Sequence, residues 1–286
     1  MAEGRQTDPD APWLALVVGN TRLHWAGFRT GQMQAVCHSP PLTAAQVNQL
    51  TQQGDFAQAW LTLFAQFAHS DPLQTFLASF EAAAPLPIEL YCASVVPQQT
   101  AIWQSYPNFH EVHLAELPLQ NQYSTLGIDR ALNLLGAGDR YGWPVLVIDA
   151  GTALTFTAGT SSGLLPRLLG GAILPGLALQ FQALNQATAA LPQLPMPSAL
   201  PPRWSTDTVS AIQGGIVLGA LATIRDFIAQ WHRQEPSGQV VLTGGDGPDL
   251  FNWLTAEKTG PGLSQDANLM FWGLNYNRQQ PQTKRR

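Results

Sequence analysis

The sequence predicts an α/β protein whose basic unit occurs twice. At 286 residues the chain is longer than most small domains with a single core, which suggests two domains or one large α/β unit. The order strand, glycine turn, strand occurs around residue 19 and again around residue 151, about 130 residues later. Helical periodicity fills much of the chain between these segments. We therefore expect a duplication at domain scale rather than a short solenoid repeat.

The first half begins with a predicted hairpin. Residues 13 to 28, "WLALVVGNTRLHWAGF", indicate a buried strand, a Gly-Asn turn and an alternating partner strand. Residues 33 to 37 can supply a third strand. Apolar residues recur at helical spacing from 43 to 84, and Pro72 marks the start of a new helix. This pattern predicts a helical layer over a sheet.

Two further strands are predicted in the first half, at 88 to 94 and around 111 to 115. The segment "VVPQQTAIW" forms the crossover between them. A second series then starts with residues 127 to 138, "GIDRALNLLGAG", which predict a helix that ends at glycine.

The second half repeats the strand and turn pattern. Residues 144 to 158 predict strand, turn and strand, and residues 163 to 176 a third strand with a glycine-rich end. Five prolines between 192 and 203 exclude helix and central strand and predict a stiff loop or lid. A long amphipathic helix follows over 205 to 231, and residues 239 to 254 predict strand, glycine turn and helix.

Composition favours a small-molecule partner. The net charge is −5, only 12% of residues are charged, and no basic cluster occurs beyond the terminal "KRR", which argues against nucleic-acid binding. No run of about 18 apolar residues and no signal-peptide pattern occurs, so we expect no membrane association and a cytoplasmic protein. Cys37 and Cys92 lack metal-ligand spacing and are expected to be reduced, buried thiols. The ends of the chain, residues 1 to 12 and 278 to 286, are expected to be flexible.

Three glycine turns each follow a short apolar strand. They are Gly19-Asn20-Thr21, Gly151-Thr152-Ala153 and Thr243-Gly244-Gly245. Glycine lets backbone N–H groups approach an anion closely, and a Thr or Asn side chain adds a donor, so phosphate is the natural ligand. Any one such pair can be a plain turn, but the duplication makes a joint coincidence less probable.

Asp149 stands at the end of a strand-forming apolar run, "VIDAGTALTF". A buried charge is unfavourable unless something fixed compensates it. Either a neighbouring group neutralises this acid, or it holds a cation or a polar ligand. A cap or turn role remains the structural alternative.

Eight motifs, in this order, resemble those of type III pantothenate kinases: "VVGNTRLHW", "SVVP", "LGIDRA", "DAGTALT", "GGAILPG", "DTVSAIQGG", "LTGGDG" and "LMFWGL". The resemblance spans roughly residues 13 to 275. It implies the fold of the acetate and sugar kinase, Hsp70 and actin superfamily, with two ribonuclease-H-like domains and ATP in the cleft between them. The implied domains cover residues 13 to 117 and 118 to 277.

The resemblance also implies an activity. Members phosphorylate pantothenate on its primary hydroxyl with ATP, which is the first step of coenzyme A synthesis. They use Mg²⁺ and a monovalent cation such as K⁺ or NH₄⁺, and they are typically homodimers.

By the same resemblance, individual residues acquire roles. Asp149 matches the position that binds the monovalent cation. The pantothenate pocket matches Gly127, Ile128, Asp129 and Arg130, with Thr208 as a further contact. The nucleotide site matches Val18, Gly19, Asn20, Thr21, Arg22 and Leu23, together with Thr152, Thr243, Gly244 and Gly245. Gly170, Gly171, Pro175 and Gly176 are expected to shape a loop beside the substrate.

Asp129 in "GIDR" is the candidate catalytic base. Phosphoryl transfer requires alignment, charge neutralisation and a group that accepts the hydroxyl proton, and a carboxylate can accept it late in the reaction. Alternatively, Asp129 and Arg130 form a salt-bridged first turn in which the helix dipole favours the acid.

The chain departs from the family at two places. The usual first motif is DxGNT, and Val17 stands at its acidic position, where valine cannot coordinate Mg²⁺. The metal is then held mainly by ATP and water, or with help from Asp149 or Asp129. The family's substrate-contacting tyrosine aligns with Gln120, and Tyr123 is the possible substitute.

The missing acid motivates an alternative function, a catalytically silent sensor of nucleotide or pantothenate with the same fold. Retention of Asp129, Asp149 and Thr152 argues against it, since a sensor needs no base. A phosphatase-type relative that hydrolyses polyphosphate has no support from the "GIDR" context.

Overall fold

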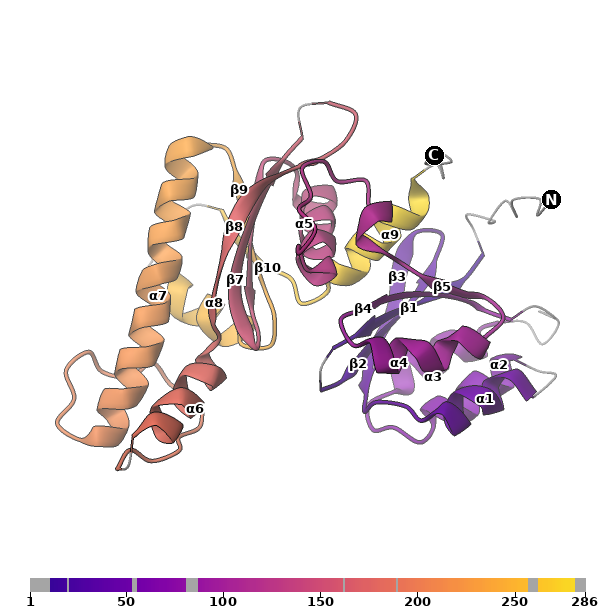
Figure 1. Cartoon of the computed structure of the whole chain (residues 1–286), viewed down its shortest axis with the longest axis horizontal. Helices are drawn as coiled ribbons and strands as arrows, with labels where there is room; N and C mark the ends of the chain where they lie inside the picture. The colour runs from indigo at the N-terminus through magenta and orange to yellow at the C-terminus, as the bar shows by residue number, and fades with distance from the viewer. Residues whose placement is uncertain are drawn as a thin grey trace. The chain divides into compact units, whose positions relative to one another are not determined.

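The chain forms two compact units in the computed structural model, which describes residues 11–19, 21–52, 56–80, 87–161, 163–188, 190–256 and 262–280. The first unit comprises Met1–Pro118, Thr125–Leu132 and Gly273–Arg286. The second comprises Leu119–Ser124 and Asn133–Trp272. Each unit contains one five-stranded sheet (Figure 1). Residues 1–10 and 281–286, expected to be flexible, lie outside the described residues.

The first unit's sheet has the strand order β3-β2-β1-β4-β5. Strands β1, β2 and β3 form an antiparallel meander, and β4 and β5 run parallel to β1. The strands are β1 (Trp13–Val18), β2 (Leu23–Arg29), β3 (Gln32–Ser39), β4 (Glu89–Ser94) and β5 (Phe109–Glu111). The predicted hairpin and third strand are therefore confirmed.

The second unit's sheet repeats this topology. Its order is β10-β9-β6-β7-β8, with an antiparallel meander of β6, β7 and β8 and parallel pairing of β9 to β6 and β10 to β9. The strands are β6 (Val145–Ala150), β7 (Ala153–Thr160), β8 (Arg167–Pro175), β9 (Gln239–Thr243) and β10 (Leu263–Gln265). Two sheets with the same order and directions confirm the predicted duplication of a ribonuclease-H-like α/β unit.

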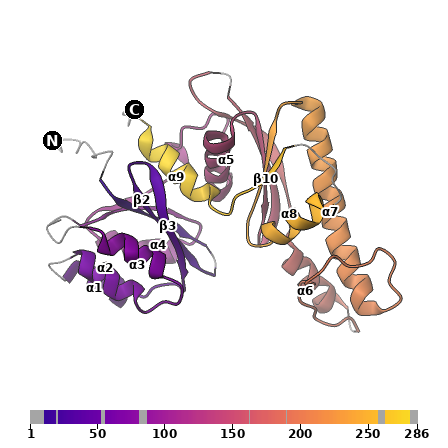
Figure 2. The same cartoon turned by 180° about the vertical axis from the view of Figure 1, so that it is seen from behind.

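Helices cover one face of the first sheet (Figures 1 and 2). They are α1 (Ala44–Gln52), α2 (Phe56–Phe64), α3 (Asp71–Ala78) and α4 (Pro97–Ala101), followed by the 3₁₀ turns η1 (Ile102–Ser105) and η2 (Leu114–Glu116). Large aromatic side chains fill the interior beneath them: Trp25, Trp60 and Trp103 are fully buried, with ring centroids 5.4 to 5.9 Å apart. Aromatic burial of this extent stabilises the unit chiefly through removal of apolar area from water.

The second sheet carries helices on both faces, as Figures 1 and 2 both show for α5 and α7. Asp207 caps the N-terminus of α7 by accepting a hydrogen bond from the backbone N–H of Ser210. The core on the α7 side contains residues of α7 and α8 packed on β6, β7 and β9. The helices of the second half of the chain are α5 (Ile128–Tyr141), α6 (Leu177–Ala187), α7 (Thr208–Gln234), α8 (Gly247–Thr255) and α9 (Leu269–Gln279); the first turn of α5 and most of α9 belong to the first unit.

Helix α7 is long and apolar enough to cross a membrane by length and composition alone, with a mean hydropathy of 1.4 over its most apolar window. Such a helix is weak evidence for a membrane span, because core helices meet the same criterion. Val217, Leu221 and Ile224 of α7 are fully buried in the core of the second unit. Its hydropathy is thus explained in part by packing on the sheet.

Several predicted boundaries were wrong. The strand expected around 111 to 115 is β5 at Phe109–Glu111, and residues 114 to 116 form η2. Helix α5 continues past Gly138, where the glycine instead permits close approach, since a Cβ there would lie 2.0 Å from the Trp143 ring. Helix α9 continues past Asn277, and Arg278 is held by a 2.9 Å ion pair with Glu89. Cys37 and Cys92 are buried free thiols, as expected.

Candidate active site

Asp149 lies where two strand-end turns of the second unit meet. It belongs to the last residue pair of the parallel strands β6 and β9, where it lies opposite Thr243. Its Oδ2 accepts a 2.9 Å hydrogen bond from the side-chain amide of Asn133, which is buried in α5. A Cβ on Gly244 would lie 2.5 Å from Oδ1 of Asp149, so this oxygen faces the β9 turn. The acid therefore has a neutral amide partner and sits against the backbone of a glycine turn.

The β9 turn requires glycine at its first position. Gly244 has φ of +90°, and a Cβ there would lie 2.4 Å from the carbonyl oxygen of Ala150. The backbone N–H of Asp246 donates to that same oxygen at 2.9 Å and fixes the turn on β6. By contrast, a Cβ on Gly245 would meet nothing within 4 Å. The turn is therefore packed against β6 at Gly244 and open at Gly245. Thr243, which precedes the turn, is buried.

The β6 turn contacts the glycine after β8. The N–H of Gly176 donates to the carbonyl oxygen of Thr152 at 3.0 Å, and a Cβ on Gly176 would lie 2.0 Å from the carbonyl oxygen of Gly151. Thr152 is exposed. Gly170, Gly171 and Pro175 belong to strand β8 rather than to a loop, so that part of the prediction was wrong.

The corresponding turn of the first unit follows β1. The N–H of Gly19 donates to the carbonyl oxygen of Arg22 at 3.1 Å and closes the turn, with Thr21 and Arg22 exposed. The side chains of Val18 and Leu23 pack in the core, so only their backbone can reach a ligand. Asn20 lies outside the described residues.

Asp129 lies in the first turn of α5, in the first unit. Its Oδ1 accepts a 2.8 Å hydrogen bond from the backbone N–H of Arg130, and its carboxylate is half-buried. A Cβ on Gly127 would lie 2.3 Å from that oxygen, so glycine is required for this side-chain conformation. Ile128 is half-buried and Arg130 is buried.

The other predicted substrate contacts lie in the second unit. Gln120 is exposed and pairs through its backbone with the start of β8, where its carbonyl oxygen accepts from the N–H of Leu168 at 3.0 Å. Tyr123 is 43% exposed. Thr208 is the exposed first residue of α7. All three side chains are therefore accessible.

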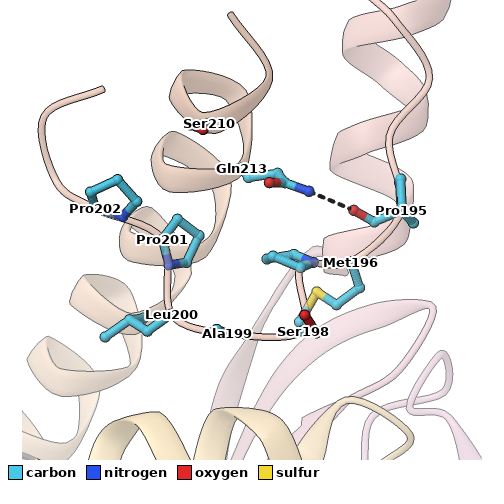
Figure 3. Close-up of a pocket in the computed structure, with 10 residues that line it drawn as sticks. Pro195, Met196, Ser198, Ala199, Leu200, Pro201, Pro202, Ser210 and Gln213 are labelled. Carbon is cyan, nitrogen blue, oxygen red and sulfur yellow. Dashed lines mark hydrogen bonds between the residues drawn. The ribbon is translucent and has the colours of Figure 1, made fainter. Parts of the chain in front are cut away.

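A pocket of roughly 470 Å³ lies between the proline-rich segment and the first turns of α7 (Figure 3). Gln213 closes one side by donating a 3.3 Å hydrogen bond to the carbonyl oxygen of Pro195. The lining carries no ionisable side chain; it consists of Pro195, Met196, Pro197, Ser198, Ala199, Leu200, Pro201, Pro202, Ser210 and Gln213. This pocket cannot itself supply an acid or a base.

The chain offers no ready-made multidentate metal centre within the described residues, where no group of three or more His, Cys, Asp or Glu side chains could hold an ion. The half-buried Asp246 beside the β9 turn has a raised pKa because of burial and the nearby carboxylate of Asp249.

Two residues that were not predicted from the sequence contact or face these turns from neighbouring elements. Asn133, the partner of Asp149, is a polar residue in an otherwise apolar stretch of α5, four positions after Asp129. That placement was a usable signal. His24 faces the first turn from β2, and its only signal was its position inside the motif "VVGNTRLHW".

Comparisons with known proteins agree over nearly the whole chain. A type III pantothenate kinase from a Nostoc species is 43% identical over 92% of both chains. One from a Synechocystis species is 39% identical and covers 93% of this chain and 90% of its own. A solved structure from Campylobacter jejuni, described under the Baf family of transcriptional activators, has a TM-score of 0.56 at 19% identity and covers 93% of this chain and 96% of its own; it shares the fold.

The family profile described as type III pantothenate kinase matches residues 13–230. That match covers well over half of the chain, and the identities above extend it to both units. Together with the duplicated sheets and their glycine turns, these findings show that the chain belongs to the type III pantothenate kinase family.

Proposed function

We propose that this chain transfers the terminal phosphoryl group of ATP to the primary hydroxyl of pantothenate, the first step of coenzyme A synthesis. The observation that carries the proposal is the 43% identity over 92% of both chains to a type III pantothenate kinase. Retention of Asp129 and of the Asp149 turn supports it. A silent sensor is not favoured, because the named relatives are kinases along the full chain.

Asp129 acts as the general base. The substrate hydroxyl oxygen bonds to the terminal phosphorus, the bond from that phosphorus to the bridging oxygen breaks, and ADP leaves. The hydroxyl proton passes to the carboxylate of Asp129. Its partial burial and the hydrogen bond from Arg130 N–H hold one oxygen in place and support this assignment. Gly127, Ile128 and Arg130 surround the same hydroxyl, with Thr208 and either Gln120 or Tyr123 as further pantothenate contacts.

The glycine turns hold the nucleotide. The open side of Gly245 leaves room for ligand atoms, which fits ATP at this turn. Thr152, Thr243 and Gly244 contribute here, and the segment from Val18 to Leu23 contributes in the first unit. Because Val17 stands where the family has a metal-binding acid, Mg²⁺ is coordinated mainly by the phosphates and water in this proposal and neutralises charge on them.

Asp149 binds a monovalent cation, K⁺ or NH₄⁺. Its carboxylate lies against two glycine turns whose backbone carbonyls are oxygen donors, and Asn133 fixes its orientation. The chain is also proposed to form a homodimer in the cytoplasm. Three exposed apolar side chains in or near the proline-rich segment support a protein contact: Trp204 is 88% exposed, Val209 43% and Leu200 38%.

The test is a coupled assay of ADP release with and without pantothenate, at several K⁺ concentrations. We expect ADP release that requires both pantothenate and K⁺. Folded protein that binds ATP but shows no turnover would favour the sensor instead. ADP-independent release of phosphate from polyphosphate would favour the phosphatase.

A further inference from the structure

The position opposite Val17 in the first sheet is occupied by His24. Strand pairing places Val17 of β1 opposite His24 of β2, and it places Asp149 of β6 opposite Thr155 of β7. Val17 and Asp149 each stand two residues before the glycine of their turn. In the second unit the ionisable side chain, Asp149, is on the central strand β6. In the first unit the ionisable side chain, His24, is on the neighbouring strand β2.

The imidazole of His24 is held between β3 and the glycine turn. Its Nδ1 lies 2.9 Å from Nδ1 of His38, and the two rings meet edge to face with centroids 4.7 Å apart. A Cβ on Gly19 would lie 3.7 Å from Nε2 of His24 and 3.9 Å from Cδ2. One edge of the ring is thus fixed by His38, and the Nε2 edge faces the turn.

The protonation of this pair leaves a neutral donor available at the turn in one of its two tautomeric arrangements. Burial, His38 and Arg22 lower the pKa of His24 to about 4, and burial and Arg22 lower that of His38. Both rings are therefore neutral near pH 7, so one Nδ1 donates and the other accepts. When His38 donates, His24 carries its proton on Nε2. That nitrogen has no hydrogen-bond partner among the residues that the structure describes.

We propose that Nε2–H of His24 donates a hydrogen bond to a phosphate oxygen of ATP at the Gly19 turn, and that His38 is a positioning residue that fixes the donor tautomer. The inference rests on the proposed function and names a phosphate contact that the valine at position 17 leaves open. A carboxylate at that position would attract the metal and its water, whereas the imidazole binds the phosphate directly.

The central test compares His24→Phe with His24→Gln. Phenylalanine keeps the ring but has no donor, whereas glutamine places an amide N–H at similar reach. We expect the KM for ATP of His24→Phe to rise about 10- to 100-fold, as for loss of one hydrogen bond to a charged group, with the KM for pantothenate little changed. His24→Gln should stay within about threefold of the wild type. Equal ATP KM values for the wild type and both variants overturn the proposal.

The positioning role of His38 has its own readout. His38→Phe should raise the KM for ATP about two- to tenfold, because the loss acts through the neighbouring ring. The control is His113→Gln, a mostly exposed histidine of the same unit, which should leave ATP binding unchanged. An effect of His38→Phe on the KM for pantothenate and not on that for ATP would contradict the role.

An NMR measurement on the folded wild-type protein tests the His24 contact without relying on a variant that can fail to fold. In ¹⁵N-histidine spectra, the His24 signal is identified by its absence in His24→Gln. We expect Nε2 of His24 to carry its proton already without ATP, and the resonances of this N–H group to shift as it forms a hydrogen bond when ATP is added. An unchanged resonance at saturating ATP overturns the proposal. Because ATP binding needs no turnover, this result stands even if the wild type fails to phosphorylate pantothenate, an outcome that would refute only the proposed function.

Discussion

The turn after β1 and the turn after β6 occupy equivalent places in sheets of the same topology, yet they present different chemistry. The β6 turn has a carboxylate, Asp149, bound to the amide of Asn133. At the equivalent place the β1 turn has the buried Val17, and a neutral histidine pair faces it from β2 and β3. By the two proposals above, the β6 turn binds a cation and the β1 turn binds an anion.

This difference shows how a duplicated unit can keep its backbone while its two copies diverge in function. Strand order, direction and the glycine turn are common to both copies, because they follow from backbone geometry. The side chain two residues before the glycine differs between the copies: it is the buried Val17 in one and Asp149 in the other. The experiments below test this division, from the largest expected effect to the smallest.

The largest effect is expected outside both turns. Asp129→Asn should lower turnover about 10²- to 10⁴-fold with little change in ATP binding, because the base is lost and both turns remain. Steady-state assays and calorimetric ATP titration measure the two quantities. Near-normal turnover of Asp129→Asn would show that the base is assigned wrongly.

The turn after β9 and the turn after β1 should differ in their tolerance of a methyl group. Gly244→Ala combines a positive φ with a clash against the Ala150 carbonyl, so the free energy of unfolding should fall by about 2–5 kcal/mol. A Cβ on Gly19 would lie 3.3 Å from the Arg22 carbonyl oxygen and at ordinary contact distance, 3.7 Å, from Nε2 of His24, so Gly19→Ala should change stability by less than about 1 kcal/mol.

Urea denaturation measures both changes, and Gly245→Ala is the matched control because its Cβ would enter open space. Equal destabilisation by Gly244→Ala and Gly245→Ala would contradict the packing of the β9 turn on β6.

The fold and the site were unequally predictable from the sequence. Periodicity and glycine turns predicted both hairpins and the long helix α7, because these features are local. The three-residue strands β5 and β10 carry too little pattern to locate, and their positions depend on pairing with β4 and β9. The sequence places Arg278 in a polar tail. In the structure its side chain is buried, pairs with Glu89 of β4 and lies over the rings of Trp13 and Tyr91.

For the site, motifs predicted residues but not their partners. The amide of Asn133 and the ring of His38 reach Asp149 and His24 from distant sequence positions. Such contacts are set by tertiary packing; a polar residue in an apolar stretch, such as Asn133, indicates that a partner exists but not which residue it is.

The proposed cation role of the β6 turn predicts a weaker response to K⁺ when its carboxylate is removed. Asp149→Asn should raise the K⁺ concentration for half-maximal activity by at least about tenfold, because one full charge near the ion is removed. A K⁺ titration of activity measures this. Asp226→Asn, an exposed acid on α7, is the control and should leave the titration unchanged. A K⁺ titration of Asp149→Asn that matches the wild type would show that the cation does not bind at this turn.

The smallest effect concerns pH. The pKa of His24 is about 4 in the folded chain and about 6.5 when unfolded, so the unfolded state binds more protons between these values. Stability therefore falls as the pH drops through this range. Between pH 7 and pH 5 the wild type should lose about 1–2 kcal/mol more than His24→Gln, after allowance for partial exposure. Urea denaturation at both pH values measures the difference, and parallel losses would argue against a buried neutral histidine.

The central claim is that this chain phosphorylates pantothenate, and ³¹P NMR of the complete reaction tests it most directly. With ATP, Mg²⁺, K⁺ and pantothenate, we expect one new phosphomonoester signal for each ADP formed, and none when pantothenate is omitted. Formation of inorganic phosphate in place of the phosphomonoester, or no reaction by folded protein that binds ATP, would contradict the account.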